Sequence, residues 1–392
     1  MDDAVLRVAY VVALDLPENL KAHAVQILKN AQSWAGACGD FELICNVSRR
    51  NWWRLRQADL AGFYGLKRTF PLRAFPLLEF EDSPHPALRH LFYRLAAWRC
   101  RLRRTDLVYT RSYAMAQFSL GLGLPTLVET HSPPERIPRG EAFLRSLDHP
   151  CLLGLVTISE VLAQKYRQAG VDPEKIVVAP DGVDLEQFRR SPSREEARLE
   201  AQWSSQRPLA LYVGHLYDGR GIEDILVAAR QLPEVDFLLV GGLADHVTRW
   251  QETCRAGGLD NVHLAGFQPN SRLPLYYAMA DLLLMPYSPK CATAEWMSPL
   301  KMFEYMASRR PLIATRLPAI EQVLRHGENA WLVAADDGQD LARGIRHILQ
   351  DEGLGRRLAD CAAREVEAFS WDRRVEGLLR RVRAKRDRSA PR

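Results

Sequence analysis

The sequence lacks the marks of membrane-spanning, secreted and repetitive proteins. Its 392 residues contain no apolar run of about eighteen, so we expect no transmembrane helix. The first residues, MDDAVLRVAYVVAL, begin acidic and have no basic segment before the apolar run. They therefore predict a first β-strand and not a signal peptide. Internal repeats and low-complexity tracts are also absent.

The cysteines lack the spacing of a metal site or a disulfide framework. There are seven, an odd number, with no CxxC pair and no histidine at metal-ligand spacing, which predicts a reduced, cytoplasmic protein without structural zinc. No Walker A motif and no GxSxG elbow occur, which argues against P-loop NTPases and α/β-hydrolases. The net charge of +5 is too small to indicate nucleic acid, and we expect no such partner.

Short apolar runs alternate with helical patterns in two successive series, and 392 residues favour two domains. Strands without polar alternation, separated by helices, indicate parallel sheets covered on both faces. We therefore predict an α/β protein with two doubly wound domains and ligands in the cleft between them. The first series has strands at 5–14, 41–47, 107–109, 126–129 and 154–158, and the second at 209–213, 236–240, 262–265 and 282–285. The predicted boundaries are 1–190, a polar linker at 191–206, and 207–370.

The segment SPLKMFEYMASRRPLIAT, residues 298–315, is the most informative part of the second series. A helix begins beside Ser298 and Pro299 and carries Glu304 in its early turns. Helix N-termini expose unpaired N–H groups that bind phosphate, and a carboxylate accepts hydrogen bonds from sugar hydroxyls. The segment predicts a nucleotide-diphosphate site; the alternative is an ordinary βα unit with one partly exposed glutamate.

Two further loops follow strands. In VGHLYDGRG, residues 213–221, Gly214 allows close approach of a ligand to the backbone, and Arg220 can clamp a diphosphate. A structural turn with a solvated arginine is the alternative. In ETHSPP, residues 129–134, Glu129 and His131 end a strand, and His131 can contact a sugar hydroxyl or position an acceptor. The alternative is a solvated loop histidine.

The region 44–110 is strongly basic, with 13 Lys and Arg against 5 acids. It contains RRNWWRLR at 49–56 and the amphipathic stretch LRHLFYRLAAWRCRLRR at 88–104. Such a surface can dock on anionic lipid, which predicts peripheral contact with the inner face of a membrane. A core-packing helix with a solvated arginine face is the alternative.

Six segments carry a resemblance to a known family. Their order and spacing resemble the family-four glycosyltransferases, from residue 5 to the FSWDRR segment at 369–374. The segments are DLVYTRS (106–112), ETHSP (129–133), TISEVLAQKY (157–166), KIVVAPDGVDLEQF (175–188), VGHLYDGRGIEDIL (213–226) and SPLKMFEYMASRRPLIAT (298–315). The resemblance implies the GT-B fold, with two Rossmann-like domains, an acceptor-side first domain and a nucleotide-sugar-binding second domain. It also implies retention of anomeric configuration, no obligatory metal or other cofactor, and a final helix, 371–392, that returns to the first domain.

The resemblance assigns roles to individual residues. Glu304 matches the second Glu of the family's E-x7-E motif, a ribose-binding carboxylate, and His131 matches a histidine beside the transferred sugar. Arg220 stands where the family usually has Lys. The catalytic prediction is thus His131, Arg220 and Glu304. The predicted substrate-binding residues are Glu129, Gly214, His215, Phe267 in the base-reading loop, Glu295, and the diphosphate loop Ser298, Pro299, Leu300 and Lys301.

Two positions depart from the family pattern. Trp296 stands where the first Glu of the motif belongs, and either Glu295 takes its role or the donor sugar is held differently. The glycine-rich loop after the first strand is replaced by residues 15–23, where Asn19, Lys21 and His23 are predicted to contact donor or acceptor.

The resulting prediction is a retaining hexosyltransferase. It would move sugar from a UDP- or GDP-linked donor to a glycan, lipid-linked or small-molecule acceptor, as in polysaccharide or lipopolysaccharide synthesis. The departing phosphate would take the acceptor's proton, and the protein would stabilise its charge. Two alternatives remain, a sugar-nucleotide 2-epimerase of the same fold and a catalytically silent scaffold member.

Overall fold

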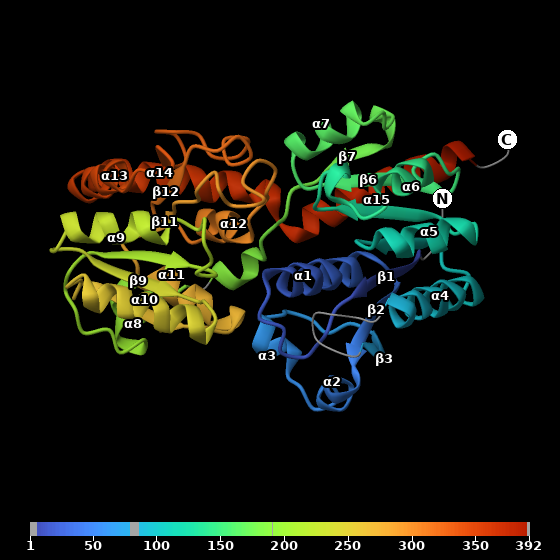
Figure 1. Ribbon diagram of the computed structural model, residues 1–392, viewed down its shortest axis with the longest axis horizontal. Coiled ribbons are helices and arrows are strands. Elements are labelled where there is room, and N and C mark those ends of the chain that lie inside the picture. The colour runs from blue at the N-terminus through green and yellow to red at the C-terminus, as the bar shows by residue number, and fades with distance from the viewer. Residues whose placement is uncertain (1–5, 79–85, 190, 390–392) are drawn as a thin grey trace. The chain divides into compact units, whose positions relative to one another are not determined.

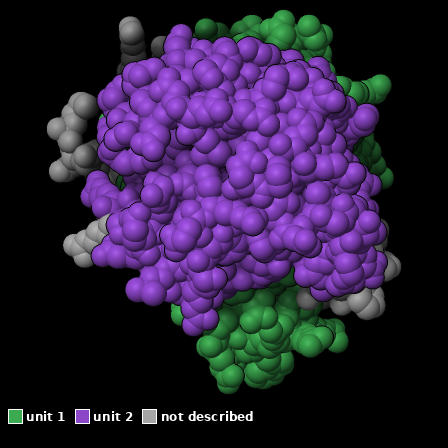
Figure 2. Space-filling view, turned by 90° about the vertical axis from the view of Figure 1, so that its left-hand side faces the viewer, with its two compact units in different colours: residues 1–180, 371–392 green, residues 181–370 purple. Residues whose placement is uncertain are grey.

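The chain divides into two compact units (Figure 2). The first comprises Met1–Pro180 together with Trp371–Arg392, and the second comprises Asp181–Ser370. The computed structural model describes residues 6–78, 86–189 and 191–389. Val5, predicted to start the first strand, and three acids of the basic region, Glu79, Glu81 and Asp82, lie outside the described residues.

The first unit is built on a parallel sheet with the strand order β3-β2-β1-β4-β5-β6-β7. Neighbouring residues of β1 point to opposite faces, so that Tyr10 enters one apolar cluster and Val11 another. Both faces are therefore buried, as expected for nearly all-apolar parallel strands. The strands are β1 (Arg7–Ala13), β2 (Asp40–Ser48), β3 (Leu72–Leu78), β4 (Leu107–Thr110), β5 (Thr126–Thr130), β6 (Leu152–Thr157) and β7 (Ile176–Val178).

Helices cover this sheet, and the last helix of the chain, α15 (Trp371–Ser389), belongs to the first unit (Figure 1). It packs beside α1, where Ser33 donates to the Asp372 carboxylate at 2.6 Å. The other helices of the unit are α1 (Ala22–Ala37), α2 (Arg49–Arg54), α3 (Leu60–Tyr64), α4 (Pro86–Leu102), α5 (Tyr113–Gly121), α6 (Gly140–Ser146) and α7 (Glu160–Gln168).

The second unit repeats the plan with a parallel sheet of order β10-β9-β8-β11-β12-β13. The direction of winding reverses between β8 and β11. Doubly wound sheets generally bind their ligands at such a point, beyond the carboxyl ends of the two strands. The strands are β8 (Leu209–Val213), β9 (Asp236–Val240), β10 (Val262–Gly266), β11 (Leu282–Met285), β12 (Leu312–Thr315) and β13 (Trp331–Val333). The helices are α8 (Arg194–Glu200), α9 (Ile222–Gln231), α10 (Ala244–Ala256), α11 (Leu273–Met279), α12 (Leu300–Ala307), α13 (Gly338–Gln350) and α14 (Glu352–Glu365).

The prediction of two doubly wound α/β domains is confirmed. The polar segment predicted as a linker, 191–206, instead lies inside the second unit and contains α8. Its helix begins because Ser193 and Glu196 form a reciprocal capping box. Within the described part of the chain, no helix has both the length and the apolar character needed to cross a membrane.

Candidate functional site

The loop after β8 brings the backbone at Gly214 against a lysine. Gly214 has φ of +147°, and a Cβ placed there would lie 2.5 Å from Lys301 Nζ. A side chain at this position would displace the end of Lys301, and L side chains rarely adopt this positive φ, so glycine favours the placement of the ammonium group beside this strand end. The structure thus brings together two of the predicted substrate-binding residues.

Arg220 joins Lys301 around the ring of Tyr287. Arg220 Cζ lies 5.0 Å and Lys301 Nζ lies 5.1 Å from the centroid of that ring, and Lys301 Nζ lies 3.9 Å from the ring of Tyr212. In the described ranges, neither cation has a carboxylate within ion-pair distance. Burial, and after it the positive charge of Arg220, hold the pKa of Lys301 well below its ordinary value, although the residue keeps some solvent contact. Two close cations without an anion form a site for a negatively charged ligand.

Helix α12 begins beside this pair with its N-terminus uncapped. Pro299 is the N-cap residue, has an extended backbone and offers no side-chain cap to the first amides. Leu300 and Pro299 are half-buried, whereas Ser298 is buried, and its hydroxyl accepts a hydrogen bond from the Asp181 amide at 2.9 Å. The positive end of the helix therefore adds to the charge of Lys301 on its first turn.

Glu304 follows on the same helix and is held by neutral donors. Tyr277 Oη donates to one carboxylate oxygen at 2.7 Å, and Asn270 Nδ2 donates to the other at 3.3 Å. The side chain is half-buried. A carboxylate has about four acceptor positions, so these two bonds orient it and leave capacity for hydroxyl groups of a ligand.

The remaining predicted residues of the second unit differ in environment. His215 stacks on the ring of Tyr217 with centroids 4.8 Å apart, and Phe267 is exposed after Gly266, whose φ is +66°. Glu295 is exposed, whereas Trp296 is 4% exposed and packs as a core side chain. An indole thus fills the position of the family's first glutamate.

In the first unit, Glu129 is the centre of a buried polar network. Its side chain is fully buried at the end of β5, and it accepts hydrogen bonds from Gln26 Nε2 at 2.9 Å, from Tyr109 Oη and from Arg374 at 2.7 Å. Burial by itself would raise the pKa of Glu129, but Arg374 and His131 outweigh it and hold this pKa well below the ordinary value. In the structure, the partners of Glu129 are other residues of the protein. Contact between Glu129 and a substrate stays a prediction.

His131 is attached to this network from the following loop. Its Nε2 lies 2.6 Å from a Glu129 carboxylate oxygen, and the half-buried ring retains solvent contact. Arg111 approaches the same oxygen at 3.7 Å. Since the carboxylate can only accept, Nε2 carries the proton, which leaves Nδ1 as the acceptor in the neutral ring.

The loop after β1 is ordered by a hydrogen bond to Tyr64 of α3 and by a hydrogen bond within the loop. The Asn19 amide donates to Tyr64 Oη at 2.9 Å, and the Lys21 amide donates to Asn19 Oδ1 at 3.0 Å. The Lys21 side chain is exposed and His23 is half-buried. Asn19 shapes the turn, and the contacts of all three with a ligand stay predictions.

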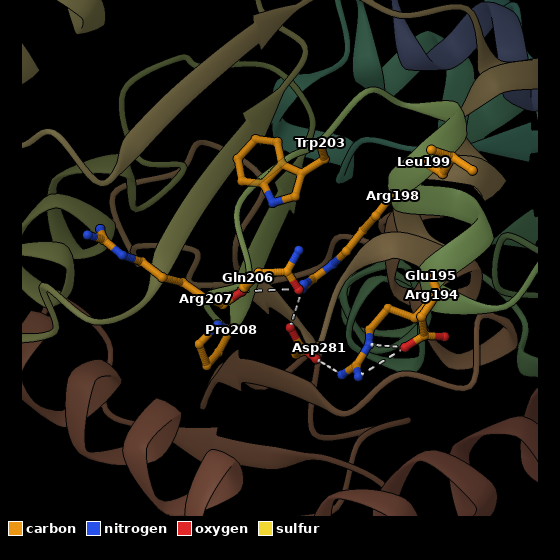
Figure 3. Close-up of a pocket in the computed structure, with 9 residues that line it drawn as sticks. All are labelled: Arg194, Glu195, Arg198, Leu199, Trp203, Gln206, Arg207, Pro208 and Asp281. Atoms are coloured by element: carbon orange, nitrogen blue, oxygen red, sulfur yellow. Dashed lines mark hydrogen bonds and ion pairs between the residues drawn. The ribbon is translucent and has the colours of Figure 1, made fainter.

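One cavity of about 350 Å³ lies elsewhere in the second unit, beside α8 (Figure 3). Asp281, directly before β11, accepts from Arg194 and from Arg198, the latter at 2.7 Å. Asp281 and Pro208 precede the strands β11 and β8, so this cavity lies at the opposite sheet edge from Gly214. None of the predicted catalytic or substrate-binding residues lines this cavity. Its lining is Arg194, Glu195, Arg198, Leu199, Trp203, Gln206, Arg207, Pro208 and Asp281.

Four residues that contact predicted site residues were not predicted from the sequence, namely Arg374, Arg111, Tyr277 and Asn270. Arg374 belongs to the FSWDRR segment that the resemblance includes, but nothing in the sequence indicates that it contacts a glutamate 245 positions earlier. Tyr277 and Asn270 precede Glu304 by one βα unit, and only the folded sheet brings them to its carboxylate.

Solved structures show the class of the fold. The chain is similar to Alr3699/HepE of Anabaena, solved in complex with UDP, with a TM-score of 0.73, 18% identity, and coverage of 96% of this chain and 100% of the other. A glycosyltransferase from Rickettsia africae gives a TM-score of 0.74 at 17% identity, covering 97% and 98% of the two chains. These similarities and the two parallel sheets define a GT-B glycosyltransferase fold with two Rossmann-like domains.

Family models specify the class further. Residues 55–187 match the model of Glycosyltransferase Family 4, and residues 207–351 match that of Glycosyl transferases group 1. The chain belongs to the family-4 glycosyltransferases, a family of sugar-transferring enzymes.

Curated relatives agree with this family. The chain is 26% identical over 259 residues to a D-inositol 3-phosphate glycosyltransferase of Streptomyces bingchenggensis, covering 62% of this chain and 54% of the relative. It is 27% identical over 233 residues to the protein of that name from Nocardia farcinica, covering 56% and 50%. The chain thus spans about half the length of the curated relatives it matches.

Proposed function

We propose that the protein transfers a sugar from a nucleotide-diphosphate donor, with retention of anomeric configuration, and that the second unit binds the donor. The observation that carries the proposal is the pair Arg220 and Lys301, two cations without a carboxylate partner among the described residues, beside the uncapped N-terminus of α12. A diphosphate supplies the missing negative charge. Glu304, one turn further on, accepts hydrogen bonds from the ribose hydroxyls. The solved complex of Alr3699/HepE with UDP supports a uridine donor.

Catalysis in this proposal is electrostatic. As the bond between sugar and phosphate breaks, negative charge grows on the leaving diphosphate. Arg220, Lys301 and the first amides of α12 stabilise that charge from fixed positions, without reorganisation of the site. The acceptor oxygen forms a bond to the anomeric carbon on the face that the diphosphate leaves, the leaving phosphate oxygen accepts the acceptor's proton, and His131 orients the reacting groups. No strong base is required, since the leaving group takes the proton.

A panel of UDP- and GDP-sugars tests the proposal. A bound donor stabilises the folded protein by about RT ln(1 + [L]/Kd), so the matching nucleotide raises the melting temperature at concentrations above Kd. Product analysis then separates the functions: free or transferred sugar supports the transferase, and an epimerised donor supports a 2-epimerase. No shift and no product with any donor would support a silent scaffold member and contradict the proposal.

We propose further that the acceptor is lipid-linked and that α4 docks the enzyme on an anionic membrane. One face of α4 is buried, including Phe92 and Cys100, whereas Leu91, Leu95, Trp98 and Leu102 are 42%, 41%, 54% and 80% exposed. The spacing of these four residues, 4, 3 and 4, forms one apolar stripe along the helix. Exposed arginines on the same helix, such as Arg94 and Arg101, add charge complementary to anionic lipid.

The region around α2 is less suited to this role. Arg56 Cζ lies 4.4 Å from the ring of Trp52 and 5.2 Å from that of Trp53, so the guanidinium is engaged with both indoles. Trp53 is nevertheless 64% exposed. The stripe on α4 is therefore the primary surface in the proposal.

Vesicle flotation of the full chain tests the docking surface. Binding to phosphatidylglycerol vesicles is expected to weaken with salt and to be lost in the double variant Leu95→Gln, Trp98→Gln. The matched control is Leu199→Gln, which removes an 81% exposed leucine of the second unit and should leave binding unchanged. Equal binding of wild type and double variant, or no binding to anionic vesicles at any salt concentration, would contradict the docking proposal alone.

A further inference from the structure

Arg374 on α15 is a buried arginine whose three guanidinium nitrogens donate hydrogen bonds to neighbouring groups around Glu129. The residue is 8% exposed. One terminal nitrogen donates to a Glu129 oxygen at 2.7 Å and to the Ala179 carbonyl at 3.2 Å, and the other donates to Tyr109 Oη at 3.2 Å. Nε donates to the Pro180 carbonyl at 2.9 Å. All three nitrogens of the guanidinium are thus fixed, which defines its plane.

The two oxygens of Glu129 have separate partners. Arg374 and Tyr109 engage one oxygen, whereas Gln26 Nε2, at 2.9 Å, and His131 Nε2, at 2.6 Å, engage the other. Arg374 thereby sets the rotation of the carboxylate, and the carboxylate sets the direction of the imidazole. A fully buried Glu129 also depends on this cation, because a buried charge without a counter-charge is strongly destabilised.

The docking of α15 does not depend on Arg374 alone. Its apolar face places Trp371, Val375 and Leu378 in buried positions, at 3%, 0% and 1% exposed. Asp372 adds a hydrogen bond from Ser33 at 2.6 Å and an ion pair with Lys67 at 2.9 Å. The helix therefore has anchors on both sides of Arg374, and a change of this side chain can be separated from loss of the helix.

We propose that Arg374 is a positioning residue: through Glu129 it holds the imidazole of His131 in the orientation and Nε2-protonated tautomer that sugar transfer uses. This inference rests on the proposed function, in which His131 orients the reacting groups. The proposal gives the last helix, α15, a role in the reaction, because α15 carries the guanidinium that aligns His131 on the loop after β5. The effect belongs to turnover and not to donor affinity, because the proposed donor residues all lie in the second unit.

Kinetics of Arg374→Met and Arg374→Lys provide the first test. Methionine keeps much of the apolar stem and removes the charge, and lysine keeps the charge without the planar fork. For Arg374→Met, kcat is expected to fall about 10²-fold with an unchanged KM for the donor, as for a side chain displaced by about 1 Å. Arg374→Lys should recover part of the loss. Arg380→Ala, an exposed arginine on the same helix, is the matched control and should behave as wild type.

Nitrogen NMR of the histidine rings provides a test that needs no activity. His131 is identified by the signals lost in His131→Gln, and the wild type is expected to show the Nε2-protonated tautomer. Arg374→Lys should keep that tautomer, and Arg374→Met should give a mixture. Glu129→Gln, which removes the charge with nearly the same shape, should give the same mixture. This variant replaces Arg374→Met in the test if Arg374→Met does not fold.

The outcomes are distinguishable. If Arg374→Met melts at a lower temperature but keeps wild-type kcat and tautomer well below its melting point, the residue is only structural and the proposal is overturned. A wild-type tautomer in Glu129→Gln overturns it as well. If the wild-type enzyme transfers no sugar from any donor, the proposed function fails, and the tautomers alone decide whether Arg374 positions His131.

Discussion

Arg220 and Lys301 approach the same aromatic ring, with Arg220 Cζ 5.0 Å and Lys301 Nζ 5.1 Å from the centroid of Tyr287. Attraction to the ring face compensates each cation only in part, and the two charges repel each other. Such an arrangement destabilises the unliganded protein. It is retained where a bound ligand compensates the destabilisation. A bound diphosphate would supply the negative charge that this pair lacks.

Lys301→Met should stabilise the protein and inactivate it. Replacing an enclosed ammonium by an apolar chain of similar length removes the desolvation cost and the repulsion from Arg220. Each kcal/mol raises the melting temperature by about 2–4 °C for a domain of this size. Turnover should fall about 10²–10³-fold, as for loss of one charge-stabilising donor. Thermal denaturation and a transfer assay measure the two effects.

The pH dependence of this stabilisation has a definite sign. The pKa of Lys301 is lowered in the folded protein, chiefly by burial. The free energy of unfolding is therefore reduced while the lysine is protonated. The difference in melting temperature should be largest at low pH and shrink as pH rises towards the ordinary lysine pKa. Lys290→Met, at an exposed lysine paired with Asp336, is the control and should change neither stability nor turnover appreciably. A destabilised, active Lys301→Met would contradict the assignment.

Arg220→Ala should lower turnover by about 10²–10³-fold with the fold intact. Arg220 has no ion pair to lose within the described ranges, and loss of its contact with Tyr287 opposes the relief of its repulsion from Lys301, so circular dichroism and the melting temperature should remain close to wild type. Arg230→Ala, at an exposed arginine of α9, is the matched control. Near-wild-type turnover of Arg220→Ala in the transfer assay would refute its role at the diphosphate.

The sheets could be predicted from the sequence because buried parallel strands are continuous apolar runs. Leu282–Met285 and Leu209–Val213 are examples that the structure reproduces. The segment 191–206 was predicted as a linker from its polarity, although Ser193 and Glu196 carry the spacing of a capping box and indicate the start of α8. Polarity alone does not distinguish a solvated helix from a loop.

The candidate site was predictable only in part. Gly214, Arg220 and the Ser298 segment follow strands, and the topology of a doubly wound sheet gathers such loops at one edge. The contact between Arg374 and Glu129 joins residues 245 positions apart, and no local pattern encodes it. The burial of Trp296 likewise depends on packing that a single sequence does not show.

Glu304→Ala should weaken donor binding more than it alters the chemical step. A hydrogen bond to a charged group contributes about 1.5–3 kcal/mol, so KM or Kd for the donor should rise about 10- to 150-fold. Tyr277→Phe removes the 2.7 Å bond that orients the carboxylate and should have the same effect at smaller size. Isothermal titration with the nucleotide diphosphate measures both. Unchanged affinity in Glu304→Ala would exclude the ribose-binding role.

Asp224→Asn should stabilise the protein above about pH 6 and not in acid. Burial, and after it the negative charge of Asp336, raise the pKa of Asp224 to about 6. A carboxyl group whose pKa is raised in the folded state does not change the free energy of unfolding at a pH where it is protonated in both the folded and the unfolded state. Above the raised pKa the carboxylate is charged in both states, and its destabilising effect on the folded state is then complete. The melting temperature of the variant should therefore exceed that of wild type at pH 8 and converge with it near pH 4. Asp260→Asn, at an exposed aspartate, is the control and should leave the melting temperature close to that of wild type. A stabilisation of Asp224→Asn that is constant from pH 4 to pH 8 would instead assign the effect to packing, because packing does not require titration of this carboxyl group.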